Sequence, residues 1–159
     1  MITFDLGSAR FTFRVAAACL HDDHVLAYKP DAEDFWFLPG GRVETMETAE
    51  EALRRELREE LDAEPRIERL LWLVENFFTL DGRRFHELGL YYHVSFPSEA
   101  ALYRTDATLR CRDAPELLIG WLPLETIEQV HLQPRFLRTH LRYLPSGIEH
   151  VVNRDPDVS

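Results

Sequence analysis

One stretch of this chain, residues 41–60, constrains its structure more than any other. It reads GRVETMETAEEALRRELREE, which is a glycine turn followed by a run of strong helix formers. At about 100° per residue, Glu56 and Glu60 lie about 40° apart on the helix surface, on the side that also carries Leu53 and Leu57. The stretch therefore predicts a helix that places two carboxylates among the residues that pack against the rest of the protein.

Carboxylates on a packing face need a partner. A buried charge is costly unless it is paired or bound to a metal, and Glu59 adds a third carboxylate whose charge repels the other two. Bound Mg²⁺ or Mn²⁺ would offset both costs. The alternative is a solvated helix face with weak Glu–Arg pairs, which explains Glu51 and Arg58 but not Glu56 and Glu60.

The same stretch resembles the Nudix box, a long and specific motif that opens with a glycine and ends with a cluster of glutamates. The matching residues are Gly41, Glu47, Arg55, Glu56, Leu57, Glu59 and Glu60, and Leu38-Pro39-Gly40 supplies the lead-in common in that family. Asp62 stands where the motif has a late glycine, and Ala63 follows as the aliphatic residue. Because Asp tolerates the left-handed backbone of a helix end, we expect Asp62 to alter the cap and not the chemistry.

The resemblance implies a fold, a reaction and a set of ligands. The implied fold is an α/β/α sandwich, and the implied reaction is Mg²⁺-dependent hydrolysis of a diphosphate linkage. Glu56, Glu59 and Glu60 would hold the metal, with Mn²⁺ able to replace Mg²⁺, and Glu56 is also the candidate for the general base within the box. The resemblance gives Arg55 the role of orienting box carboxylates, together with Glu47.

The start of the helix can be interpreted residue by residue. Gly40 and Gly41 permit a turn that brings backbone N–H groups close to a phosphate, although an ordinary turn explains them equally well. Thr48, with Glu51 three residues later, forms a capping box that we expect to begin the helix. Glu47 then lies at the helix entrance, where the helix dipole favours a negative charge.

Periodicity predicts the remaining elements. Strands are expected at 11–20, 24–29, 34–38, 67–80, 84–96 and 117–122, and further helices at 124–130 and 134–144. Asp81-Gly82 is a hairpin signal between two of the strands. Residues 97–115 have the composition of a loop, and 153–159 that of a disordered tail, which leaves 1–152 as a single domain. This mixture of strands and helices independently favours an α/β/α sandwich with a mixed β-sheet.

Several strand residues are candidates for binding the substrate. Arg14 lies beside alanines on its strand and either reaches into a pocket or pairs at the sheet margin. Glu87 and Tyr91 share a strand face with a gap at Gly89, a pattern typical of a ligand-facing surface but equally of a half-exposed strand. Arg84, next to the hairpin, either contacts phosphate or is a solvated charge. The aromatic residues available to stack on a base are Phe77, Phe78, Tyr91 and Trp121, whereas Trp36 and Phe35 are interpreted as core.

A second carboxylate for proton transfer is sought outside the box. Family enzymes often use an acidic residue in a late loop, and Glu116 follows Pro115 in such a loop. Glu87 is the alternative on the strand face. A loop can bring a carboxylate over a bound substrate and withdraw it, so we favour Glu116 over Glu87 as the accessory catalytic carboxylate.

Composition limits the partners. The formal charge of −10 over 159 residues argues against binding a nucleic-acid polymer, and no apolar run is long enough for a membrane span or an export leader. Cys19 and Cys111 lack metal-ligand spacing and are expected to be reduced thiols in a cytoplasmic protein. A homodimer is left open.

The substrate is expected to be a small phosphorylated molecule. The window after the box, residues 76–80, lacks the features of the ADP-ribose, dinucleoside polyphosphate and NADH subgroups of the family, so a nucleoside di- or triphosphate is preferred. The alternatives are a sensor that binds a nucleotide or phosphosugar without turning it over, and a helix-mediated interaction module.

Overall fold

A computed structural model describes the chain over residues 1–104 and 109–158. Its strands are β1 (Thr3–Leu6), β2 (Ala9–His21), β3 (His24–Pro30), β4 (Trp36–Phe37), β5 (Gly40–Arg42), β6 (Arg66–Leu80), β7 (Arg83–Ser95), β8 (Leu109–Arg110), β9 (Leu117–Pro123), β10 (Leu132–Gln133) and β11 (Glu149–Arg154). Its α-helices are α1 (Ala49–Leu61) and α2 (Leu137–His140), and its 3₁₀ helices are η1 (Ala101–Tyr103) and η2 (Leu124–Gln129).

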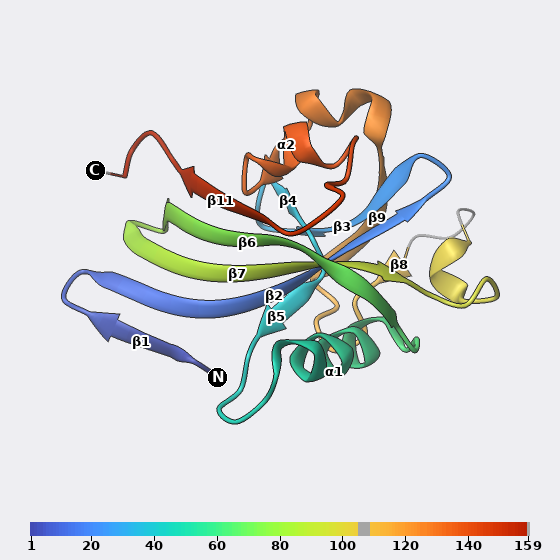
Figure 1. The fold of residues 1–159 in the computed structure, drawn as a ribbon, viewed down its shortest axis with the longest axis horizontal. Helices are drawn as coiled ribbons and strands as arrows, with labels where there is room; N and C mark the ends of the chain where they lie inside the picture. The colour runs from blue at the N-terminus through green and yellow to red at the C-terminus, as the bar shows by residue number, and fades with distance from the viewer. Residues whose placement is uncertain (105–108, 159) are drawn as a thin grey trace.

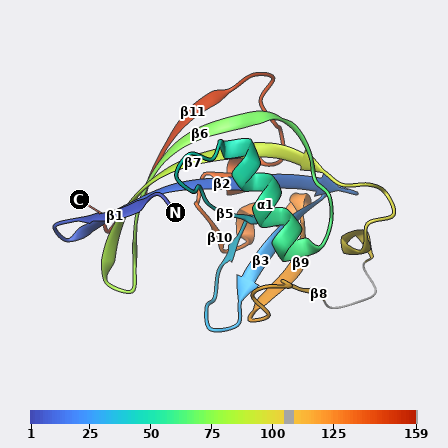
Figure 2. The same cartoon turned by 90° about the horizontal axis from the view of Figure 1, so that it is seen from below.

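The strands form a mixed sheet in the order β10-β4-β3-β2-β7-β6-β11. Strand β2 runs parallel to β7 and β6 runs parallel to β11, whereas β6 and β7 are antiparallel. Helix α1 lies on one side of this sheet and α2 on the other (Figure 1), and Figure 2 shows α1 lying across the strands. The expected α/β/α arrangement with a mixed sheet is confirmed.

All six predicted strands are present, as β2, β3, β4, β6, β7 and β9, although β4 keeps only two residues. The hairpin between β6 and β7 turns at Asp81 and Gly82, with φ of 51° and 74°. Five short or late strands had no periodic signal, because a strand of two to six residues on a sheet edge shows little alternation.

The box helix α1 begins and ends as its sequence predicts. The Thr48 hydroxyl accepts a hydrogen bond from the Glu51 N–H, and the Glu51 carboxylate accepts one from the Thr48 N–H at 2.8 Å. At the other end, Asp62 has φ 52° and ψ 39°, and its N–H donates to the Arg58 carbonyl at 3.1 Å. Asp62 therefore supplies the left-handed cap in place of a glycine.

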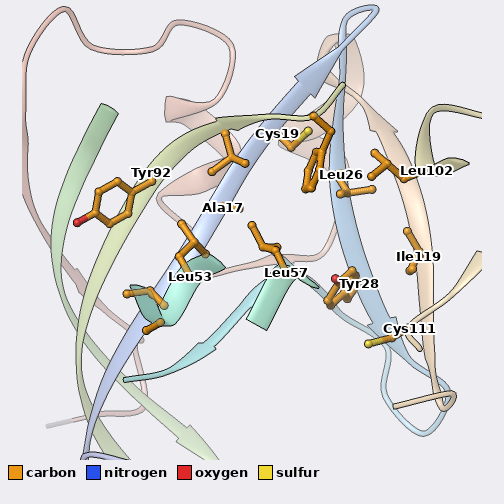
Figure 3. Packing of buried hydrophobic residues seen from close by; sticks show 14 of the residues in the cluster. Ala17, Cys19, Leu26, Tyr28, Leu53, Leu57, Tyr92, Leu102, Cys111 and Ile119 are labelled. Atoms are coloured by element: carbon orange, nitrogen blue, oxygen red, sulfur yellow. The ribbon is translucent and has the colours of Figure 1, made fainter. Parts of the chain in front are cut away.

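A hydrophobic core lies between α1 and the sheet. Leu53 and Leu57 of α1 pack towards Ala17 of β2 and Tyr28 of β3, and all four side chains are fully buried (Figure 3). Burying each leucine stabilises the fold by about 1.5–3 kcal/mol. Cys19 belongs to the same core.

A second core lies on the opposite face of the sheet. Trp72 of β6 and Tyr91 of β7 contact Phe136, and Leu137 and Leu141 pack around them. Both faces of the central strands are thus covered. Cys19 and Cys111 are buried free thiols, as expected. Among the residues that the structure describes, no helix has the length and apolarity to cross a membrane.

The C-terminal third differs from the prediction. The expected helix at 124–130 is the 3₁₀ helix η2, and of the helix expected at 134–144 only the four residues of α2 are α-helical. Burial of Leu137 and Leu141 and a side-chain hydrogen bond to the Phe136 N–H hold this turn in place, so it does not need helix length.

The predicted start of the disordered tail, at residue 153, is also wrong. Asn153 and Arg154 were assigned to the tail at 153–159, but they are the last residues of β11, and Asn153 is only 7% exposed. The polar composition concealed a strand because its partner, β6, lies more than seventy residues earlier. Residue 159, like part of the 97–115 loop, lies outside the described residues.

Candidate active site

The two glycines before α1 each allow a different close contact, Gly40 with the backbone of β2 and Gly41 with the side chain of Glu56. A Cβ on Gly40 would come within 2.0 Å of the Val15 carbonyl oxygen, and Gly40 has φ 150°, so only glycine lets β5 lie against β2 here. A Cβ on Gly41 would come within 2.2–2.6 Å of the Glu56 carboxylate. Gly41 therefore makes room for the Glu56 carboxylate. Contact of their N–H groups with phosphate stays a prediction.

Arg55 connects three parts of the box. Its Nε and Nη2 donate to the two carboxylate oxygens of Glu47 at 2.8 and 2.9 Å, and its Nη1 donates to Glu56 Oε1 at 2.7 Å. Nη2 also donates to the Arg42 carbonyl at 3.2 Å. The bonds from Arg55 hold the pKa of Glu47 below its usual range. Arg55 thus fixes the orientation of Glu56 relative to β5 and the helix entrance.

Glu56 and Glu60 lie in a partly dehydrated environment. Burial raises the pKa of Glu56, and the opposing bond from Arg55 does not cancel this effect. Glu60 is only 7% exposed, and burial raises its pKa to about 8. The Tyr28 hydroxyl donates to Glu60 Oε2 at 2.9 Å, and burial raises the pKa of Tyr28 as well. The prediction that these two glutamates lie on the packing side of α1 is confirmed.

Glu59 faces a shallow hollow at the end of α1. Its side chain is 50% exposed and lies 3.7 Å from Arg55 Nη1. The same hollow is lined by Arg112 and Asp113 from the loop before β9. That loop is attached to the helix end, because the Arg112 N–H donates to the Glu60 carbonyl at 2.8 Å.

The oxygen-rich ligand set Glu56, Glu59 and Glu60 suits Mg²⁺ or Mn²⁺. In the described residues, no three His, Cys, Asp or Glu side chains are gathered closely enough to hold a metal ion. Glu56 is turned towards Arg55 and Glu60 towards Tyr28. However, the charge of Glu59 acts on Glu56 and that of Glu56 on Glu60, which is the repulsion that a cation relieves. The donors therefore fit a divalent cation that draws the carboxylates together.

A groove of about 480 Å³ adjoins the box on the sheet face away from α1. Arg14 lies at the junction. It lines the groove, its Nη2 donates to the Leu38 carbonyl at 3.1 Å, and its charge acts on both Glu56 and Glu60. Its guanidinium lies 5.6 Å from the centre of the Phe37 ring. The groove thus has a cationic end beside the box.

The structure brings some of the predicted substrate-binding residues together. Phe78, Glu87 and Tyr91 line the groove with Arg14. Phe78 stacks on Phe85 at 4.8 Å between ring centres, with 4° between the planes. Tyr91 is only 2% exposed and packs edge-on against aromatic neighbours, so it contributes to the end of the groove and not to a stacking surface.

Other candidates lie elsewhere. Arg84 donates to the Ser8 hydroxyl and does not line the groove. Phe77 packs against His86 and Arg154, and Trp121 stacks on Tyr103, so neither faces the groove.

The late loop places a different acid near the box. Glu116 is exposed, and within the described residues no side-chain hydrogen bond or ion pair joins it to a box carboxylate. Asp113, three residues earlier, accepts a hydrogen bond from Cys111 Sγ at 3.2 Å, and its charge acts on Glu60. The accessory role of Glu116 stays a prediction. Of the two loop carboxylates, Asp113 is the one whose charge acts on a box residue, Glu60.

Sequence reasoning missed several groove and site residues. Thr12 could have been found, because strand alternation places it on the same face as Arg14. Phe35 was interpreted as core but lines the groove. Tyr28 and Asn153 left no local signal, because their polar partners, Glu60 and Asn76, are distant in the chain.

Comparisons with known proteins place this geometry in a family. The NUDIX domain profile matches residues 11–144. The solution structure of the E. coli ORF135 protein is 28% identical, with 87% of this chain and 91% of that chain covered and a TM-score of 0.54. A MutT NUDIX hydrolase from Burkholderia pseudomallei is 27% identical, with coverages of 72% and 84% and a TM-score of 0.50.

A third structure supports the fold alone. A MutT protein from Bacillus halodurans is 14% identical, with 93% of each chain covered and a TM-score of 0.60. A comparison with curated proteins found no match.

Proposed function

The chain belongs to the NUDIX domain family, and from this premise we propose that it is a Mg²⁺-dependent pyrophosphohydrolase. Its proposed substrate is a nucleoside di- or triphosphate, or a related nucleoside diphosphate derivative, cleaved within the diphosphate linkage. One observation carries the proposal: Arg55 holds Glu56 beside Glu59 and Glu60, while Gly41 leaves room for the Glu56 carboxylate. This arrangement supports a metal-assisted phosphoryl site.

The box residues have separate proposed roles. A divalent cation held by Glu56, Glu59 and Glu60 would neutralise phosphate charge and acidify a water molecule. Glu56 Oε1 is occupied by Arg55, which leaves Oε2 as the atom that takes a proton from the attacking water. Burial raises the pKa of Glu56 and so favours proton uptake by this carboxylate, an effect that a bound cation would oppose.

The groove has room for the nucleoside. Arg14, at the end next to the box, is placed to pair with a phosphate oxygen. The stacked pair of Phe78 and Phe85 offers a flat apolar surface for a base further along the groove. The substrate would therefore lie with its phosphates towards α1 and its base towards the hairpin between β6 and β7.

The broader proposals concern partners and location. The formal charge of −10 argues against a nucleic-acid polymer, but it does not argue against a small phosphorylated substrate, because a bound metal inverts the local charge. Two buried free thiols suit a reducing compartment, so a cytoplasmic location remains part of the proposal. A single domain that extends through β11 to Arg154, and a homodimer, also remain part of the proposal.

The decisive experiment is hydrolysis in heavy-oxygen water. Purified protein with Mg²⁺ is incubated with a panel of nucleoside di- and triphosphates and nucleoside diphosphate derivatives, and the products are followed by mass spectrometry. We expect two phosphate-containing products, one of which carries the heavy oxygen and so identifies the attacked phosphorus. Chelation of the metal and Glu59→Gln should each abolish most turnover.

The same experiment separates the alternatives. Binding of a nucleotide without turnover of any compound would favour the non-catalytic sensor. Absence of both binding and turnover, with Mg²⁺ present, would favour the interaction module. A rate that chelation leaves unchanged would contradict the metal assignment even if hydrolysis occurs.

A further inference from the structure

Four polar side chains form a row across the sheet, one from each of four neighbouring strands, and three of them, Thr12, Asn76 and Glu87, line the groove. The four are Thr12 of β2, Glu87 of β7, Asn76 of β6 and Asn153 of β11, which are paired in register across the sheet. Thr12, Asn76 and Asn153 are 1%, 5% and 7% exposed. Buried polar groups are costly unless they form hydrogen bonds, so the bonds within this row hold its side chains in fixed orientations.

The direction of these bonds is set by a backbone group. The Phe136 N–H, which can only donate, bonds to Asn153 Oδ1 at 3.3 Å. Asn153 must then donate from Nδ2, and it does so to Asn76 Oδ1 at 2.8 Å. Asn76 Nδ2 is left to donate, and it bonds to Glu87 Oε1 at 3.3 Å.

The row therefore ends on an acceptor. From the other side, the Thr12 hydroxyl donates to Glu87 Oε2 at 3.3 Å. Each donor in the row points towards Glu87, and the two bonds that it accepts hold its carboxylate in place. An ionised carboxylate has about four lone-pair sites, and these two bonds occupy only two of them. Glu87 is partly exposed and lines the groove, so its free lone pairs are available to a ligand.

The surroundings of Glu87 suit a flat ring. Phe85, two residues earlier on the same face of β7, stacks on Phe78. The gap expected at Gly89, two residues later, is filled, because Gly89 is buried and a Cβ there would come within 2.8 Å of the Tyr91 ring. Within the described residues, no hydrogen bond or ion pair joins Glu87 to a box residue. Glu87 is therefore placed to bind the substrate and not to transfer a proton at the phosphates.

Building on the proposed hydrolase function, we propose that Glu87 determines base specificity by accepting a hydrogen bond from an amino group of the substrate's nucleobase. The substrate class is a nucleotide whose base carries an exocyclic amino group, as cytosine, adenine and guanine do. Uracil and hypoxanthine, which carry a carbonyl or a hydrogen in its place, are disfavoured.

The discrimination has a simple physical origin. A carbonyl oxygen in the place of the amino group would bring two acceptors together, and a hydrogen in its place would remove the donor that faces Glu87. Sites built to bond a specific polar group reject analogues that lack it far more strongly than apolar pockets do. We expect a preference of about tenfold or more for the amino-bearing member of a matched pair.

The test compares pairs of bases that differ at one group. The ratio of kcat/KM is measured for CTP against UTP and for GTP against ITP, with Mg²⁺ present. In parallel, binding of CMP, UMP, GMP and IMP is measured by calorimetry. The monophosphates contain no diphosphate linkage, so their binding reports base preference even if the proposed hydrolase activity fails.

The variant is Glu87→Gln. Its Oε1 can accept from Asn76 and its Nε2 can donate to the Thr12 hydroxyl, so the row of hydrogen bonds and the fold are expected to survive, which a melting curve checks. The matched control is Glu75→Gln on β6, whose carboxylate bonds to His150 on the opposite face of the sheet.

The expected result is an amino preference in at least one pair, in turnover or in binding, that Glu87→Gln brings close to one and Glu75→Gln leaves unchanged. Ratios near one in both pairs for the unmodified protein would overturn the proposal. So would a preference that Glu87→Gln leaves intact, or an equal loss of kcat on all substrates, which would make Glu87 part of the proton-transfer chemistry. Base preference in binding without any turnover would support Glu87 while refuting the hydrolase.

Discussion

At the level of single residues, Arg55 organises the box more than any glutamate does. Its planar guanidinium bonds both oxygens of Glu47 and one oxygen of Glu56 while also holding the β5 carbonyl of Arg42. A lysine ammonium cannot reproduce this forked geometry. The position therefore demands arginine for shape as much as for charge.

Arg55→Lys should lower kcat/KM by about tenfold or more, because charge-assisted hydrogen bonds are each worth about 1.5–3 kcal/mol and several are lost. Steady-state kinetics measure the loss. The control is Arg58→Lys on the same helix, since Arg58 is exposed and, among the residues that the structure describes, its side chain pairs with Glu64 alone. Equal activities of the two variants would show that Arg55 does not position Glu56.

The adjacent glycines should respond differently to a methyl group. In Gly41→Ala the new Cβ meets the Glu56 side chain, so we expect turnover to fall sharply while the melting temperature changes little. In Gly40→Ala it meets the backbone of Val15 at a positive φ, so we expect loss of stability.

Melting curves and kinetics on both glycine variants separate the two effects. Gly147→Ala is the control, because no atom lies within 4 Å of a Cβ there. Full activity in Gly41→Ala would mean that the Glu56 carboxylate can move away without consequence for the reaction.

At the level of elements, helix α1 combines a stable local structure with an electrostatic cost. Its capping box and its buried leucines stabilise it, whereas Glu56, Glu59 and Glu60 repel one another near its C-terminal end. Folding alone leaves this repulsion in place. A divalent cation bound by these three carboxylates would relieve their repulsion.

Millimolar Mg²⁺ or Mn²⁺ should therefore raise the melting temperature, because a ligand of the native state at a hundred times its Kd adds about 2.7 kcal/mol of stability. Sodium chloride at matched ionic strength is the control for general screening. The rise should disappear in the double variant Glu59→Gln, Glu60→Gln. A shift that sodium chloride reproduces would favour the solvated-helix interpretation.

The loop before β9 offers two carboxylates, and the structure ranks them. Both side chains are exposed, but the charge of Asp113 acts on Glu60, so Asp113→Asn should reduce kcat more than Glu116→Gln. Loss of a general base costs about 10²- to 10⁴-fold in rate, and loss of an accessory charge costs less. If Glu116→Gln loses more, the loop closes over the substrate and the prediction from the sequence is correct.

At the level of the whole molecule, strand β11 connects β6 with the start of α2, two segments that are far apart in the sequence. Asn153 bonds to Asn76 in the floor of the groove and to the Phe136 N–H at the start of α2. One side chain from the end of the chain thus links the substrate groove to the second core.

Asn153→Ala should lower the free energy of unfolding by about 1–3 kcal/mol, because it leaves a buried N–H and a buried amide oxygen unsatisfied. Urea denaturation measures the change, with Val152→Ala as the exposed neighbour on the same strand. Equal stability of both variants would mean that water replaces the lost bonds.

Local sequence was sufficient to predict the box helix and the strands that alternate over many residues. The capping box at Thr48, the left-handed cap at Asp62 and the buried position of Glu60 follow from interactions between residues close in the chain. Strand alternation left it open whether Arg14 and Glu87 face a ligand or lie at a sheet margin or on a half-exposed strand, and the structure shows that both line the groove. Local sequence did not predict that the helical segments η2 and α2 near the C-terminus are so short, nor did it predict the two-residue strands.

Which of these residues meet was decided by tertiary structure alone. Thr12 and Glu87 are separated by 75 residues, Asn76 and Asn153 by 77, and Tyr28 and Glu60 by 32. The parallel pairing of β2 with β7 and of β6 with β11 brings the first two pairs together. Periodicity reports which side of an element faces inwards, but it carries no information on which distant strand lies alongside, because that choice depends on packing of the whole core.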